Sequence, residues 1–365
     1  MREKLIPHVK YVVPIASGKG GVGKSTVSVN LALALAKTGA KVGLMDADVY
    51  GPSIPTLLKI DSKPVMENNR LHPVERYGIK VISMGFFIPV NDAVIWRGPM
   101  LHKMVQDFLG AVEWGSLDYL LIDLPPGTGD IQLSLCQTVQ VDGAVIVSTP
   151  QEVAWNVAQK AIVMFDKLNA PVAGVIENMS AYNCSHCGHR DEIFGSGMAL
   201  RDAEMLEIPF LGDIPVQTQI RLASDAGDPV VHSDPGSAAA KSFLAIAERL
   251  VAELARVSGR KTKPVPTKFG SPNSSTVDIE WSDGLKTSHK ARELRYLCPC
   301  ASCVNEVTGE RQIKLEWVPQ TLTASAFYPV GRYALQILWS DGHATGLYGY
   351  DFLRSMACAK PSEVH

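Results

Sequence analysis

Ten residues near the N-terminus, Ser17 to Thr26, have the spacing of a phosphate-binding loop. An apolar run precedes them and a run of helical period follows, so the expected order is strand, glycine loop, helix. Glycines lack Cβ atoms, which lets the backbone curl around a phosphate with its N–H groups pointing inward, and the helix start adds a positive dipole. The residues predicted to bind nucleotide here are Gly18, Lys19, Gly20, Gly21, Val22, Gly23, Lys24, Ser25 and Thr26.

The loop and three aspartates could together bind a magnesium ion and activate a water molecule for hydrolysis. We expect Lys24 to reach the β- and γ-phosphates of ATP and the Ser25 hydroxyl to bind Mg²⁺. Asp46, Asp48 and Asp123 lie at the ends of predicted buried strands, where open α/β sheets place their ligands. Asp46 and Asp123 are predicted near the metal, and Asp48 is predicted to orient the attacking water. Either Asp46 or Asp48 could instead cap the next element.

An asparagine follows another predicted strand, which covers residues 171–176. The amide of Asn178 offers both a donor and an acceptor, so it could read an adenine edge. A turn asparagine is the alternative interpretation of this position.

Cys184 and Cys187 form a Cys-x-x-Cys pair that is expected between a strand and a helix. Two thiolates are half of a tetrahedral set, and three arrangements are compatible with them. His186 or His189 could complete a zinc site within the chain. The pair could be a redox dithiol. Alternatively, two chains could each contribute one pair and hold a [4Fe–4S] cluster across a dimer axis.

A second cysteine cluster lies near the C-terminus, where Cys298, Cys300 and Cys303 fall within six residues. One metal centre held by three thiolates needs a fourth ligand, and His343 is the best candidate. Zinc and an iron–sulfur cluster both accept ligands of this kind. A small domain benefits from such a metal.

The pattern of the remaining chain indicates two domains. Strands alternate with helices from residue 11 to residue 257, which predicts an α/β fold with a doubly wound, mostly parallel sheet of the P-loop NTPase type. A stretch rich in Lys, Pro, Ser and Gly then predicts a linker. Short β signals at 277–281, 311–317 and 333–339, with a Ser-Asp-Gly turn after the first and another after the last, predict a small β-rich metal-binding domain. The predicted segments are the ATPase domain 1–257, the linker 258–276 and the second domain 277–365.

Composition narrows the partners and the compartment. The 365 residues carry a net charge of −2, which does not favour nucleic acid or an anionic membrane as partner. Seven cysteines, five of them in two clusters, suggest metal binding in a reducing cytoplasm rather than disulfides. No signal peptide is expected before the first strand, and no apolar run is long enough to span a bilayer. These features predict a cytoplasmic protein.

The run Gly18 to Thr26 resembles the deviant phosphate loop of the MinD, ParA and nitrogenase-iron-protein ATPases. In that class the extra lysine, here Lys19, reaches the nucleotide of a second subunit, so the resemblance implies a role for Lys19 in hydrolysis and an ATP-dependent homodimer. Residues 11–257 look more specifically like the Mrp/ApbC family, in the stretches 46–53, 96–100, 124–130 and 177–180 and in the cysteine pair. That resemblance implies an ATPase that carries iron–sulfur clusters to apoproteins, with Cys184 and Cys187 as cluster ligands.

The second domain resembles the N-terminal domain of gamma-butyrobetaine hydroxylase, in the stretches 281–284, 294–303, 331–334 and 339–343. There, three cysteines and a histidine bind structural zinc, which implies zinc at Cys298, Cys300, Cys303 and His343. The hydroxylase's catalytic domain has no counterpart here, so no oxygenase activity is expected.

A competing function comes from a different class of protein. A positioning switch similar to ParA or MinD, without cluster chemistry, would share the phosphate loop and Lys19 but would leave the Cys184–Cys187 pair unexplained. ATP-dependent binding to DNA or to liposomes would favour it.

Overall fold

In the computed structural model the chain divides into two units, residues 1–260 and 261–365, each described below by itself. The structure describes residues 5–87, 98–127, 129–183, 187, 189–195, 197–259, 264–305, 308–330 and 333–358. Within these residues, no helix combines the length and the apolar character needed to cross a membrane.

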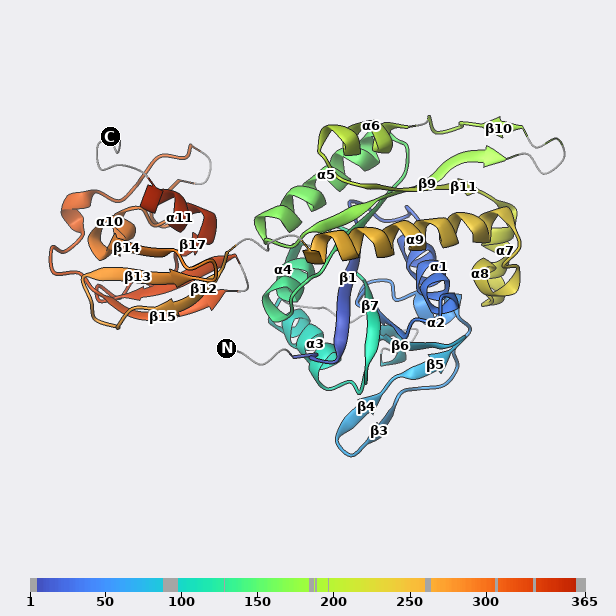
Figure 1. The fold of residues 1–365 in the computed structure, drawn as a ribbon, viewed down its shortest axis with the longest axis horizontal. Helices are drawn as coiled ribbons and strands as arrows, with labels where there is room; N and C mark the ends of the chain where they lie inside the picture. Colours follow the sequence, from blue (N-terminus) through green and yellow to red (C-terminus); the bar gives the residue numbers. More distant parts are fainter. Residues whose placement is uncertain are drawn as a thin grey trace. The chain divides into compact units, whose positions relative to one another are not determined.

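The first unit is built on a nine-stranded sheet in the order β10-β9-β8-β1-β7-β2-β6-β5, with β11 paired to β9 (Figure 1). All neighbours along β6-β2-β7-β1-β8-β9-β11 run parallel, and only the edge strands β5 and β10 pair antiparallel. The strands of the first unit are β1 Val9–Ser17, β2 Val42–Asp46, β3 Val65–Glu67, β4 Arg70–His72, β5 Val74–Arg76, β6 Ile79–Ser83, β7 Leu117–Asp123, β8 Ala144–Ser148, β9 Val172–Asn183, β10 Arg190–Asp191 and β11 Phe210–Val216.

Helices cover both faces of this sheet, as the doubly wound prediction requires. One face forms a large buried core with α1, α8 and α9, while α3, α4 and α5 pack on the other side. The helices of this unit are α1 Lys24–Lys37, α2 Ile54–Leu57, α3 Gly98–Gly110, α4 Gly129–Thr138, α5 Glu152–Lys167, α6 Met198–Met205, α7 Thr218–Ala226, α8 Val230–Ser233 and α9 Ala238–Gly259, with a 3₁₀ turn η1 at Met84–Phe86. Strands β2 and β8 are buried along their whole length, and β7 is buried at every residue except Asp118, which explains their continuous apolar runs.

The second unit holds two antiparallel three-stranded sheets, β12-β13-β14 and β15-β16-β17, around one apolar core. Both Ser-Asp-Gly turns form as predicted, and Gly284 and Gly342 take positive φ angles of 88° and 84°. The elements are β12 Pro266–Phe269, β13 Thr276–Trp281, β14 Lys286–Lys290, α10 Ala291–Tyr296, η2 Leu315–Trp317, β15 Ala324–Val330, β16 Ala334–Trp339, β17 Leu347–Gly349 and α11 Tyr350–Cys358.

Three details of the sequence prediction are wrong. The stretch 258–276 is not a linker throughout, because β12 lies inside it and pairs with β13. This edge strand exposes its two middle residues, so it lacks an apolar period. The stretch 311–317 is not a strand but contains only a bridge at Arg311 and the turn η2. Finally, β9 does not stop before Asn178 but continues to Asn183, because β11 supports it on one side.

Candidate functional site

The glycine loop between β1 and α1 borders an open cavity of about 290 Å³ at the carboxyl ends of the central strands. The helix begins at Lys24, and Gly23 before it has a φ of 78°, a conformation that favours glycine. The cavity is lined by Ser17, Lys19, Gly20, Gly21, Val22, Gly23, Lys24, Ser25, Thr26, Asp48, Ser53, Leu57 and Pro126. All predicted loop residues except Gly18 therefore face one space large enough for phosphate groups.

The fully buried carboxylate of Asp123 accepts hydrogen bonds from an ammonium group and from hydroxyl groups of the loop and of α1. The Lys24 ammonium lies 2.7 Å from Oδ1, and the Ser25 hydroxyl donates to Oδ2 at 2.6 Å. Ser28 also donates to Oδ1, at 2.7 Å. The Ser25 hydroxyl and the Asp123 carboxylate supply hard oxygen atoms side by side, which suits Mg²⁺. Sequence reasoning missed Ser28, although it lies one helical turn after Lys24 on the same face.

The other two predicted carboxylates lie at different depths. Asp48 lines the cavity, and its Oδ1 accepts the N–H groups of Tyr50 and Gly51, each at 3.1 Å. Asp46 lies behind it, fully buried, and accepts the Ser83 hydroxyl at 2.8 Å. Burial, and then the neighbouring Asp123, raises the pKa of Asp46 to about 7. Ser83 was not predicted; it occupies the end of β6, opposite Asp46 in the strand register.

The amide of Asn178 contacts the phosphate-binding loop rather than the open cavity. Its Nδ2 donates to the carbonyl oxygen of Val22 at 2.8 Å, in a buried setting. A Cβ atom on Gly23 would overlap with this nitrogen, so the loop and β9 meet without spare room. The predicted contact between Asn178 and adenine stays a prediction.

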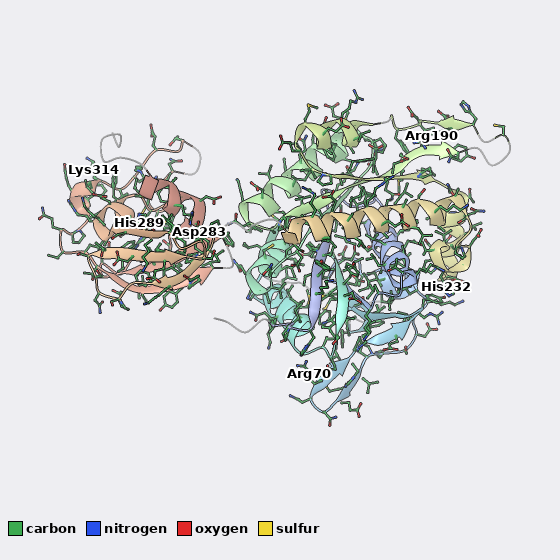
Figure 2. All side chains as sticks on the ribbon, in the orientation of Figure 1. Arg70, Arg190, His232, Asp283, His289 and Lys314 are labelled. Atoms are coloured by element: carbon green, nitrogen blue, oxygen red, sulfur yellow. The ribbon has the colours of Figure 1, made fainter. Side chains whose placement is uncertain are left out.

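The cysteine pair occupies the connection between β9 and β10, two antiparallel strands, and not a strand–helix connection as predicted. Cys187 is exposed, while Cys184 lies outside the described residues. Figure 2 labels Arg190 on β10 at the outer edge of this unit. Asp213 of β11 holds both strands, because it accepts the Ser180 hydroxyl at 2.6 Å and an Arg190 N–H at 3.1 Å. Among the described residues, no group of three or more metal-ligating side chains includes Cys187.

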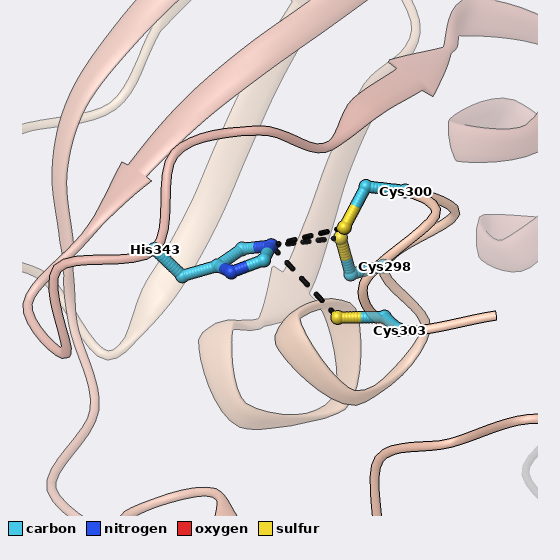
Figure 3. A group of neighbouring side chains, drawn as sticks. All are labelled: Cys298, Cys300, Cys303 and His343. Carbon is cyan, nitrogen blue, oxygen red and sulfur yellow. Dashed lines mark hydrogen bonds between the residues drawn. The ribbon is translucent and has the colours of Figure 1, made fainter.

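The second unit brings Cys298, Cys300, Cys303 and His343 together, as predicted (Figure 3). The cysteines follow α10 and the histidine follows β16, so both sheets position the site. The Nε2 atom of His343 lies 3.2, 3.4 and 3.9 Å from the sulfurs of Cys298, Cys300 and Cys303. All four ligand atoms lie within 4.8 Å of one another. A tetrahedral ion with bonds of about 2.0–2.3 Å spaces its ligand atoms about 3.5–3.8 Å apart, so the four fit one metal ion.

The protonation of these ligands depends on their surroundings. Burial raises the pKa of the Cys298 thiol to about 12. Burial also raises the pKa of Cys300, but hydrogen bonds, led by the one from Thr345, outweigh it and bring that pKa to about 7. Burial and the nearby Arg295 lower the pKa of His343, which favours the neutral imidazole that a metal requires. A bound cation would supply the charge that keeps a buried thiolate such as Cys298 ionised.

Two residues that sequence reasoning missed support this metal site. The buried guanidinium of Arg295 donates to the Cys303 sulfur at 3.4 Å and to Asp341 at 2.8 Å. The second Asp341 oxygen accepts the backbone N–H of His343 at 3.0 Å. Gly346 leaves room for Cys298, because a Cβ there would lie 2.5 Å from its sulfur. Their positions in the sequence could have indicated both residues, because Arg295 comes three residues before the first cysteine and Gly346 comes three residues after the histidine.

In comparisons with known proteins, two separate parts of the chain match two different families. Residues 8–251 match the family model described as NUBPL iron-transfer P-loop NTPase, and residues 270–354 match that of the gamma-butyrobetaine hydroxylase-like N-terminal domain. The chain is 50% identical over 250 residues to an iron–sulfur cluster carrier protein of Aquifex aeolicus, covering 68% of this chain and 69% of that protein. It is 48% identical over 256 residues to the iron–sulfur cluster transfer protein NUBPL of Mus musculus, covering 69% and 80%.

Solved structures agree with the fold of the first unit. A nucleotide-binding protein of Archaeoglobus fulgidus in complex with ADP is 43% identical, with a TM-score of 0.55, over 61% of this chain and 88% of that one. The cell division ATPase MinD of Pyrococcus furiosus is 25% identical, with a TM-score of 0.51, over 66% and 98%. The matched family region covers more than half of the chain and contains the loop, the carboxylates and the cysteine hairpin, and the chain therefore belongs to the NUBPL-type family of iron-transfer P-loop NTPases.

Proposed function

We propose that this chain is an ATP-hydrolysing iron–sulfur cluster carrier that holds a [4Fe–4S] cluster between two copies of itself and transfers it to apoproteins. The observation that carries the proposal is the exposed Cys187 in the connection between β9 and β10. No third ligand stands beside it in the described part of the chain. A second copy would bring an identical Cys184–Cys187 pair and complete four thiolates, which is the usual ligand set of such a cluster.

The geometry around Asp123 supports ATP as the nucleotide substrate and hydrolysis as the reaction. Lys24 would pair with the β- and γ-phosphates, and Ser25 and Asp123 would hold Mg²⁺, which neutralises charge on the transferred phosphoryl group. Asp48 reaches the same cavity and would orient the attacking water. Asp46 lies deeper, so we assign it to supporting Asp48, whose backbone N–H donates to Asp46 at 3.1 Å.

Lys19 supports the homodimer part of the proposal. Lys19 lines the cavity, and no ion pair of the described chain engages its ammonium, in contrast to Lys24. An unpaired lysine beside the phosphates of its own subunit is available to a nucleotide held by a second subunit. ATP binding would then determine how the two copies, and their cysteine pairs, meet.

We further propose that the second unit holds one structural Zn²⁺. The spacing of the four ligand atoms suits one ion, whereas a cluster distributes its ligands over several metal atoms and needs a wider spacing. Three thiolates and one imidazole form a common closed zinc set. The ion would join the loop after α10 to the turn after β16 and stabilise a small domain.

Metal analysis of paired variants tests both sites. Anaerobic reconstitution with iron and sulfide is followed by iron, sulfide and zinc analysis of the native chain, of the Cys184→Ala/Cys187→Ala variant, and of Cys300→Ala as the matched control. We expect the double variant to lose iron and keep zinc, and Cys300→Ala to lose zinc and keep iron. Equal iron in the double variant and the native chain would refute the carrier proposal.

The competing switch function is tested on the same samples. ATP-dependent pelleting with liposomes or retention of DNA, in a chain that takes up no iron, would support a positioning switch instead. The compartment stays a prediction, because curated relatives include a mitochondrial protein of Arabidopsis thaliana, 45% identical over 269 residues.

A further inference from the structure

A single strand joins the phosphate-binding loop to the cysteine hairpin. Asn178, in the middle of β9, donates to the Val22 carbonyl at 2.8 Å, and both groups are buried. Five residues later β9 ends at Asn183, the residue directly before Cys184. The side chain of Met179 ends 3.7 Å from the place that a Cβ on Gly23 would occupy. If the loop moves at Val22 or Gly23, it therefore pushes on two consecutive residues of β9, Asn178 and Met179.

The strand is irregular at this point. Met179 has a φ of 59°, in the left-handed region that a non-glycine residue in a strand rarely adopts. Between the paired positions Asn178–Ile214 and Tyr182–Val216, β9 advances four residues while β11 advances two. The extra residues lack ladder partners, so their backbone angles can change without loss of the flanking hydrogen bonds. Backbone strain held in this way clusters at sites that switch or bind.

The residues on either side of Asn178 and Met179 tie β9 to two neighbouring elements, α6 and β11. The buried carboxylate of Glu177 accepts the backbone N–H of Ala199 at 3.2 Å, at the start of the helix that follows the hairpin. Ser180 and Arg190 meet on Asp213, which fixes the base of the hairpin to β11. The hairpin is thus held on its two flanks, and Asn178 is the point at which this assembly contacts the nucleotide loop.

We propose that Asn178 and Met179 are positioning residues that transmit the nucleotide state of the loop to the cysteine hairpin. The inference rests on the proposed function, because it takes ATP as the ligand of the loop and an iron–sulfur cluster as the ligand of the hairpin. Phosphates that enter the loop reorient its peptide groups, and the Val22 carbonyl carries that change to the Asn178 amide. The irregular segment 179–181 then shifts the end of β9, and with it the two thiolates.

Two measurements on the full chain test the proposal. The first is hydrogen exchange of the apoprotein amides in residues 180–191, with and without saturating Mg-ATP. The second is the rate at which an iron chelator removes the reconstituted cluster under the same two conditions. The variants are Asn178→Asp, which keeps the shape but loses the N–H donor, and Asn178→Ala. Arg190→Ala is the matched control, because it removes a contact of the hairpin with Asp213 and touches neither the loop nor residues 179–181.

We expect ATP to change both rates about fivefold or more in the native chain, within the usual range of coupling between sites. In the Asn178 variants, the ratio of each rate with ATP to the same rate without ATP should fall to about one. A deviation within about twofold still counts as no coupling, because independent sites show scatter of that size. Arg190→Ala should raise both rates and keep the native ratio. If Asn178→Asp or Asn178→Ala folds, is saturated with ATP and still shows the native effect of ATP on both rates, the inference is overturned.

Failure of the proposed function gives a different result. If the native chain takes up no cluster at Cys184 and Cys187, the carrier proposal fails, but hydrogen exchange of the apoprotein still tests the link. If the chain holds a cluster and ATP changes neither rate, the link fails while cluster binding stands.

Discussion

Asp46 and Asp123 are register partners on the neighbouring parallel strands β2 and β7, so two fully buried carboxyl groups end side by side below the nucleotide cavity. Asp123 accepts hydrogen bonds from the Lys24 ammonium and two serine hydroxyls, whereas in the described part of the chain Asp46 accepts them from the Ser83 hydroxyl and from backbone N–H groups. Burial disfavours the charged form of Asp46, and the neighbouring Asp123 disfavours it further. Asp46 is therefore the carboxyl whose pKa rises, to about 7.

The raised pKa predicts a particular pH dependence of stability. The folded chain holds a proton on Asp46 that the unfolded chain releases near pH 3.8, so the folded state binds more protons between pH 3.8 and about 7. The Asp46 contribution to the free energy of unfolding must then fall as pH rises through this window. Asp46→Asn, a mimic of the protonated form, should flatten this part of the profile, measured by urea unfolding without nucleotide. An unchanged profile would mean that Asp46 is ionised when folded.

The two lysines of the loop should respond differently to the same substitution. Lys24→Gln leaves the Asp123 carboxylate buried without its cation, which costs about 3–5 kcal/mol of stability, and removes ATP binding. Lys19→Gln breaks no ion pair of the described chain, so stability and ATP affinity should stay close to native while phosphate release falls about 100-fold. Thermal unfolding, ATP titration and phosphate release check the contrast. If the Lys19→Gln variant releases phosphate at the native rate, Lys19 has no role in hydrolysis.

Much of this arrangement could be predicted because local signals and tertiary contacts agree. The loop Gly18–Thr26 and the strand ends at Asp46 and Asp123 follow from apolar runs that stop at a polar residue, and parallel sheets bury such runs completely. The Cys3His set followed from its spacing and from the resemblance to the hydroxylase domain. What could not be predicted depends on pairing between distant segments. The length of β9 is set by β11, and β12 is an edge strand whose exposed residues carry no apolar period.

Donors and small residues that serve a site from another element were also invisible in the sequence. Ser83 reaches Asp46 from β6, and Gly346 makes room for a cysteine 48 positions earlier in the chain, Cys298. Neither residue belongs to a motif, and each is defined by a contact that only the folded chain creates. A substitution at such a residue changes one contact, whereas the loss of a motif residue disrupts several interactions at once.

Gly346 provides a test of the metal site that changes no ligand. A Cβ at this position would lie 2.5 Å from the Cys298 sulfur, so Gly346→Ala should displace a ligand and lower the zinc content and the stability of the second unit. Gly349→Ala is the matched control, because the nearest atom to its Cβ is 4.0 Å away. Zinc analysis and thermal unfolding compare the two variants. Full zinc content in Gly346→Ala would show that Cys298 can move aside without losing the metal.

Arg295 tests whether groups beyond the four ligands set the metal affinity. Its guanidinium bonds both the Cys303 sulfur and Asp341, and Asp341 in turn orients the backbone of His343. Arg295→Met keeps the bulk but removes the charge, and should weaken zinc binding about 10- to 100-fold, as measured by competition with a chromophoric chelator. Arg295→Lys should recover only part of this, because one ammonium cannot reproduce the fixed fork of donors. Because Asp341→Asn keeps an acceptor for His343 and weakens the pairing with Arg295, it should fall between the native chain and Arg295→Met. If Arg295→Met binds zinc like the native chain, the contact with Cys303 contributes to packing alone, and the affinity resides in the three thiolates and the imidazole.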